Sequence, residues 1–210
     1  MKNEFIKRLL TSIILIPAIS FLIIEGSFFF NFFLIICFFI TSYEWLNMIK
    51  KNLIRYIGLI FLILSFYTVY KIRNDFDQNY LYLLIVTIVC ISTDIGGYII
   101  GKIVGGPKLI KISPNKTYSG SIGSYLFSVI FIYGYLNYEQ IEFSVDIFVF
   151  ILIISTVSQF GDILISYFKR VSKIKDTGKI IPGHGGLLDR IDGMIFAFPF
   201  SYLIYLNWTF

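Results

Sequence analysis

The sequence predicts an all-α integral membrane protein, a polytopic bundle of about seven transmembrane helices with a cytoplasmic N-terminus. Three observations predict this class. The 210 residues are 57% hydrophobic and only 15% charged, whereas about 25% charged residues are usual in soluble domains. Long apolar stretches recur along the chain, and nearly all Lys and Arg residues fall on one side of them. This composition excludes a soluble globular domain.

Each predicted helix is an apolar stretch close to the roughly 20 residues that a membrane span needs. The stretches are 9–24, 28–49, 56–72, 79–101, 120–138, 147–168 and 191–208. The first follows Lys2, Lys7 and Arg8 as a signal peptide would, but no A-x-A-like cleavage site follows, so we interpret it as an uncleaved helix. Cys37 and Cys90 lie inside apolar stretches and are expected to be packing residues.

These stretches leave no room for a soluble domain, so 1–210 is predicted to be one membrane domain. We divide it into N-terminal helices at 1–75 and a catalytic core at 76–210. Only the connections 102–119 and 169–190 are long, and both are rich in Lys, Gly and Pro. Connections of that length are usually functional or disordered.

The distribution of cations predicts which way the chain is inserted, because cytoplasmic loops carry the excess of Lys and Arg. With the N-terminus inside, all but Lys71 and Arg73 of the 18 Lys and Arg residues lie on the cytoplasmic side. The sequence therefore predicts a multi-pass protein of the inner or plasma membrane, with loops 102–119 and 169–190 in the cytoplasm.

The candidate carboxylates at or within the apolar stretches are Asp94, Asp162, Asp189 and Asp192, and an unpaired charge there costs several kcal/mol. Asp162 belongs to a polar stripe with steps of three and four residues, which places its members on one helix face. The stripe contains Ser155, Ser158, Gln159, Asp162, Ser166, Lys169 and Arg170. We expect its serines to hydrogen-bond neighbouring helices and Asp162 to be functional.

In the stretch 79–101, Gly97 and Gly101, followed by Gly105, form a ridge that we interpret as a helix-packing surface. For Asp94, which lies beside this ridge, a structural pairing with a lysine and a catalytic role both stay open.

Asp189 and Asp192 are three residues apart, so on a helix they project side by side. Such acids can simply cap a helix. Together with Asp162 they could also bind a hard divalent cation such as Mg²⁺, which makes these three residues the candidate metal ligands.

The loop 102–119 contains Ser113-Pro114-Asn115-Lys116-Thr117 directly before a predicted helix. Hydroxyl, amide and ammonium donors in this position could hold a phosphate group. Basic cytoplasmic loops also serve as orientation signals or contact anionic lipids, and that reading stays open.

The second loop carries the most specific pattern, S-x-x-K-R-x4-K-D-x-G-x3-P-G-H-G-G-x-x-D-R-x-D, from Ser166 to Asp192. It resembles the pattern of the phosphatidate cytidylyltransferases, also called CDP-diacylglycerol synthases, at every fixed position. Asp94, Tyr98 and Gly101 followed by 113–117 resemble another block of this family, so the resemblance covers about 94–192. Upstream, only Arg8 and Glu44-Trp45 look similar. The chain departs from the family at Tyr118 and Ser119, where Trp and Glu are usual, and it is short for the family.

The resemblance implies a nucleotidyltransferase that condenses CTP with phosphatidic acid, giving CDP-diacylglycerol and pyrophosphate, with Mg²⁺ as cofactor. Asp162, Asp189 and Asp192 are then the expected metal ligands, and Gly183, Gly185 and Gly186 let backbone N–H groups approach an anion. His184 is expected to contact phosphate or to protonate pyrophosphate, although it could simply fix the turn. Lys175, which would clamp phosphate, is grouped with these acids and His184 as a candidate catalytic residue. The remaining candidate substrate contacts are Asp94, Ser113, Asn115, Lys116, Thr117, Lys169, Arg170 and Arg190.

The expected partners are CTP and phosphatidic acid, with a homodimer left open and no nucleic acid. A CTP-dependent lipid kinase is an alternative that would use similar loops and acids. A transporter of an anionic solute is less favoured, because repeated halves and broken spans are not found. The D-G-x-x-A-R run expected of a CDP-alcohol phosphotransferase is absent, since Asp192-Gly193 continues into Met194.

Overall fold

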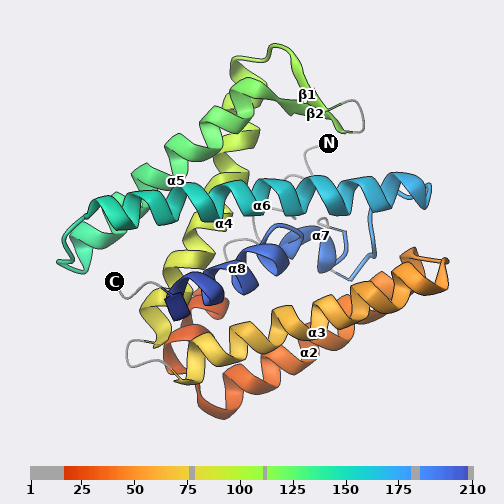
Figure 1. Cartoon of the computed structure of the whole chain (residues 1–210), viewed down its shortest axis with the longest axis horizontal. Helices are drawn as coiled ribbons and strands as arrows, with labels where there is room; N and C mark the ends of the chain where they lie inside the picture. Colours follow the sequence, from red (N-terminus) through yellow and green to blue (C-terminus); the bar gives the residue numbers. More distant parts are fainter. Residues whose placement is uncertain (1–16, 76–78, 111–112, 181–184, 208–210) are drawn as a thin grey trace. The chain divides into compact units, whose positions relative to one another are not determined.

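The computed structural model describes residues 17–75, 79–110, 113–180 and 185–207. Five of its helices are long and apolar enough to cross a membrane (Figure 1). They are α2 (Ser27–Met48), α3 (Asn52–Asp75), α4 (Asn79–Ile103), α5 (Tyr118–Tyr138) and α6 (Val145–Val171). These helices confirm the predicted class, an all-α multi-pass membrane protein.

The two outer predicted spans differ from the five. The first half of the stretch 9–24 lies outside the described residues, and its described half, from residue 17 onward, is helical. At the other end, 191–208 is not one helix. A short helix α7 (Leu188–Ile191) ends at Ile191, and a separate helix α8 (Met194–Asn207) follows with only 14 residues.

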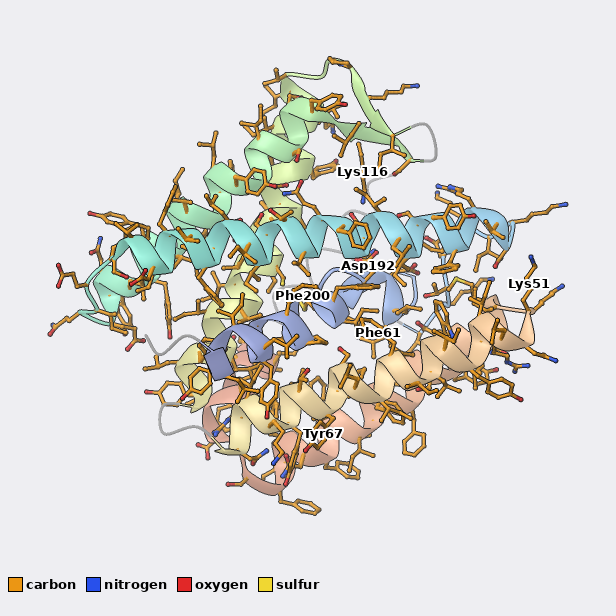
Figure 2. The ribbon with its side chains drawn as sticks, in the orientation of Figure 1. Lys51, Phe61, Tyr67, Lys116, Asp192 and Phe200 are labelled. Carbon is orange, nitrogen blue, oxygen red and sulfur yellow. The ribbon has the colours of Figure 1, made fainter. Side chains whose placement is uncertain are left out.

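The chain forms two compact units, residues 1–84 with 168–192 and residues 85–167 with 193–210. In the first unit, α2 and α3 lie side by side and run antiparallel (Figure 1). Lys51 lies in the short turn between them (Figure 2). The Trp45 indole occupies the space where a side chain on Gly58 would lie, 2.1 Å from an added Cβ, and donates a hydrogen bond to the Arg55 carbonyl. The Phe168 ring packs edge-on against Trp45, at 5.3 Å between centroids, so the aromatic pair holds the end of α6 within this unit.

In the second unit, α4 and α5 approach each other along small residues. A Cβ added to Gly96 would lie 2.4 Å from the Gly123 carbonyl oxygen, and one on Gly97 would lie 2.7 Å from Ser124 Oγ. The packing interpretation of Gly97 and Gly101 is therefore confirmed, but it is wrong for Gly105. That residue lies beyond the end of α4 with φ +63°, and nothing stands within 4 Å of its Cβ position, so it serves the turn.

The loop 102–119 contains an antiparallel hairpin that the sequence did not predict, formed by β1 (Lys108–Ile110) and β2 (Ser113–Thr117). Thr117 then caps α5 by accepting a hydrogen bond from the Gly120 N–H at 3.0 Å. Ser119, at the position where the family usually has Glu, donates to the Gly105 carbonyl at 2.5 Å and lies 3.0 Å from Thr117 Oγ1. Ser119 thus ties together the two ends of the hairpin.

Hydroxyl groups of the α6 polar stripe bond to other helices of the same unit. Thr93 donates to Ser155 at 2.9 Å, and Thr93 and Ser128 are also 2.9 Å apart. Further along the stripe, Ser121 of α5 donates to Gln159. The interpretation that the stripe's hydroxyl groups bond across the helices is confirmed for Ser155.

Candidate functional site

Lys169, near the end of α6, lies between two carboxylates of the first unit. Its Nζ is 2.9 Å from Asp189 Oδ1 and 3.9 Å from Asp192 Oδ2. The exposed fractions of the three side chains are 13%, 6% and 9% respectively, so the pair is nearly buried. Asp192 is labelled in Figure 2, beside α7. The structure therefore brings together Asp189 and Asp192, as their spacing predicts, around a lysine that the sequence analysis assigned to substrate binding.

Asp189 also holds the two ends of the loop that precedes it. Its Oδ2 accepts hydrogen bonds from the Thr177 N–H at 2.8 Å and from the Gly186 N–H at 3.0 Å. Gly185 has φ +88°, a backbone conformation that glycine adopts without strain. Asp189 lies in the first turn of α7, as the capping alternative supposes, but both N–H groups that it accepts from precede the helix, so it does not cap the N–H groups of α7.

Glu44 of α2 is a functional candidate that the sequence analysis did not select. It is only 2% exposed. Its carboxylate accepts hydrogen bonds from Thr177 Oγ1 at 3.0 Å and from the N–H groups of Leu187 at 3.0 Å and Leu188 at 2.8 Å. The sequence did contain a signal for Glu44, because it is an acid inside the apolar stretch 28–49. Acids inside membrane spans are functional candidates, and Asp162 was selected for that reason.

In the second unit, Asp162 pairs with Lys116 of β2, which Figure 2 labels. Lys116 Nζ is 2.5 Å from Asp162 Oδ2, with 22% and 30% of the two side chains exposed. Ser166, one turn along α6, donates to Asp162 Oδ1 at 3.3 Å. The structure thus joins the Ser113–Thr117 segment to the polar stripe of α6 through an ion pair.

The other predicted site residues are more exposed than the Lys169 cluster, or they lie outside the residues that the structure describes. Ser113 and Thr117 are half-buried in β2, and Asp94 is exposed on α4. The side chain of Asn115 and the whole of Gly183 and His184 lie outside the described residues. Five cations of the second loop are exposed: Arg170, Lys173, Lys175, Lys179 and Arg190. Such a group of like charges attracts a polyanion to this loop.

The acids fit a divalent cation in part. Carboxylate oxygens suit Mg²⁺, and Asp189 and Asp192 already converge on one positive charge, the Lys169 ammonium group. Both oxygens of Asp189, however, have donors within the protein. Across the described ranges, no group of three His, Cys, Asp or Glu side chains is placed to hold a metal ion. The pair Asp189 and Asp192 is therefore the part of the predicted ligand set that fits.

Long apolar helices, a nearly buried cluster of one lysine and two acids, and a loop of exposed cations define a multi-pass membrane protein suited to an anionic substrate. The sequence matches the model of the cytidylyltransferase family over residues 53–208, and the chain belongs to this family. It is thereby a nucleotidyltransferase by family.

Curated relatives named phosphatidate cytidylyltransferase match most of the chain. The Rickettsia bellii protein is 35% identical over 212 residues, covering 97% of this chain and 91% of the relative. The Bacillus subtilis protein is 35% identical over 69% of this chain, and the Staphylococcus haemolyticus protein is 38% identical over 70%. The alignments cover 55% and 54% of these last two relatives, so the chain spans about half of their length.

Proposed function

We propose that this chain is a phosphatidate cytidylyltransferase, which joins CTP to phosphatidic acid and releases pyrophosphate. One observation carries the proposal: Lys169, Asp189 and Asp192, three residues of the family-like pattern, form a nearly buried cluster. The names of the curated relatives support the same activity.

In this reaction a phosphate oxygen of phosphatidic acid forms a bond to the α-phosphorus of CTP. The bond from that phosphorus to the oxygen that bridges it to the β-phosphate breaks, and pyrophosphate leaves with the electron pair. Because the attacking phosphate is already anionic, the protein needs mainly to position the substrates and neutralise charge.

The cations of the two loops supply that neutralisation in our proposal. Arg170, Lys175 and Arg190 are exposed and are the proposed triphosphate contacts, and the arginines can bind two oxygens at once. Lys116 is a further phosphate contact. His184 is proposed to contact phosphate or to protonate the departing pyrophosphate.

Mg²⁺ is the proposed cofactor, with Asp189 and Asp192 as the residues that would hold it. When bound, it would supply positive charge to the pyrophosphate oxygens. Asp162 is also proposed as a metal ligand, on the basis of the sequence alone. Within the protein, Lys169 keeps the two carboxylates close together by pairing with both.

The active site is proposed to face the cytoplasm, where CTP is available. The excess of Lys and Arg on the side of loops 102–119 and 169–190 supports this orientation. The proposal makes no use of a homodimer.

The test is to incubate the purified protein with CTP labelled at the α-phosphate, phosphatidic acid and Mg²⁺. We expect label to enter the lipid while pyrophosphate is released in equal amount. Formation of CDP and a newly phosphorylated lipid would instead identify a CTP-dependent lipid kinase. Absence of both products, with anion uptake into vesicles that contain the protein, would favour the transporter.

A further inference from the structure

We propose that Glu44 is a positioning residue for CTP binding, which it supports by holding in place, from helix α2, the two described ends of the second loop, Thr177–Gly178 and Gly186–Leu188. This inference rests on the proposed function, because the loop is where the triphosphate is expected to bind. Glu44 itself is buried and is not proposed to touch substrate.

The contacts of Glu44 reach both ends of this loop. Thr177 Oγ1 donates to Oε2 at the start, while Leu187 N–H donates to Oε1 and Leu188 N–H to Oε2 at the end. Leu187 is the residue before α7, and it has no capping side chain of its own. The carboxylate of Glu44 therefore supplies, from another helix, the acceptors that a local cap would supply.

The loop also approaches Glu44 too closely to leave room for side chains. A Cβ added to Gly178 would lie 2.4 Å from Glu44 Oε1, and one added to Gly186 would lie 2.6 Å from Oε2. Glycine at both positions lets the backbone wrap around the carboxylate. The same Gly186 donates its N–H to Asp189, so Glu44 and Asp189 hold adjoining parts of one loop.

A carboxylate is required here for a reason of hydrogen-bond chemistry. An ionised Glu accepts at both oxygens and donates from neither, which matches the three donors that surround it. A Gln would direct an N–H₂ donor at another donor and leave a buried group unsatisfied. Hydrogen bonds to a charged acceptor are also stronger than those to a neutral one.

The experiment compares Glu44→Gln, Thr177→Val and Thr177→Ser with the unaltered full-length protein in the labelled CTP assay. We expect Glu44→Gln to raise the KM for CTP about tenfold, with a smaller change in kcat, because the loop loses strong hydrogen bonds without losing a reacting group. Thr177→Val should raise the KM in the same direction, and Thr177→Ser, which keeps the hydroxyl, should restore it. Ser42→Ala is the matched control, since Ser42 is buried on the same helix and its Oγ has no hydrogen-bond partner.

Hydrogen exchange of the backbone amides of residues 185–192 supplies a readout independent of turnover. Glu44→Gln should speed exchange there and leave exchange in α5 unchanged. A KM for CTP and an exchange rate within twofold of the unaltered protein would overturn the role of Glu44. Absence of labelled lipid with the unaltered protein would instead overturn the proposed function, while the exchange measurement would still decide whether Glu44 holds the loop.

Discussion

At the scale of single residues, the acid–lysine pairs of the two units differ in how far they are buried. Asp189 has 6% of its side chain exposed and also accepts two backbone hydrogen bonds. Asp162 has 30% exposed and pairs with a lysine that is itself partly exposed. Breaking a buried pair leaves an uncompensated charge, whereas a more exposed pair is screened by solvent. The two acids should therefore differ in their contribution to stability.

We predict that Asp189→Asn and Asp162→Asn each abolish CTP-dependent turnover, because each removes negative charge without loss of volume. Asp189→Asn should in addition lower the stability of the protein, by about 3 kcal/mol. For Asp162→Asn we expect a loss of under about 1 kcal/mol. Turnover and thermal unfolding in detergent measure the two effects. Near-normal activity in both variants would contradict their assignment as metal ligands, and equal unfolding temperatures would contradict the difference in burial.

His184→Ala should lower the rate but leave measurable turnover. The phosphate of phosphatidic acid is already a nucleophile, so loss of a proton donor slows only the departure of pyrophosphate. The measurement is kcat at saturating CTP, with CTP binding checked separately. A variant that binds CTP normally but forms no product would show that His184 has a larger part in the reaction.

At the scale of elements, the contact between α4 and α5 depends on the absence of side chains. Gly123 illustrates this best, because an added Cβ would lie 2.4 Å from Ile100 Cβ and 2.8 Å from the Gly96 carbonyl oxygen. Gly134, on the same helix, has nothing within 4 Å of its Cβ position. One helix thus contains a glycine required by packing and one that is not.

We predict that Gly123→Ala destabilises the protein by about 1–3 kcal/mol, because the two helices must separate to admit the methyl group. Gly134→Ala is the matched control and should be neutral or stabilising by up to about 1 kcal/mol, since Ala is the better helix former. Thermal unfolding of both variants in the same detergent compares them. Equal behaviour of the two variants would argue against close packing of α4 on α5.

The loop 169–190 shows how much of an element can be predicted locally. Its glycines, its cations and the spacing of Asp189 and Asp192 were all recognised in the sequence. The break between α7 and α8 was not, because the apolar pattern continues through Asp192-Gly193 without a proline. The β1–β2 hairpin was missed for a similar reason, since five residues with Ser, Pro, Asn, Lys and Thr carry no strand periodicity.

At the scale of the whole molecule, the remaining question with a direct test is the orientation in the membrane. We predict that Lys173→Cys, in the second basic loop, reacts with an impermeant maleimide only from the cytoplasmic side. Glu142→Cys, between α5 and α6, should react only from the outside. Both positions are exposed, whereas the native Cys90 is buried and Cys37 lies within α2, so the unaltered protein gives the background. Labelling of the two positions from the opposite sides would reverse the proposed topology.

The sequence by itself determined the class of this protein and the residues of the family-like motif, and it located the five long apolar helices among seven predicted spans. These are local properties, because length, hydropathy and spacing can be read within one stretch of chain. Only the tertiary structure decided which groups meet. Glu44 bonds to Thr177 and Leu188, which lie 133 and 144 residues away in the sequence, and Lys116 pairs with Asp162. Such contacts depend on how helices and loops pack together. The periodicity of a single segment does not indicate which distant residues it will contact.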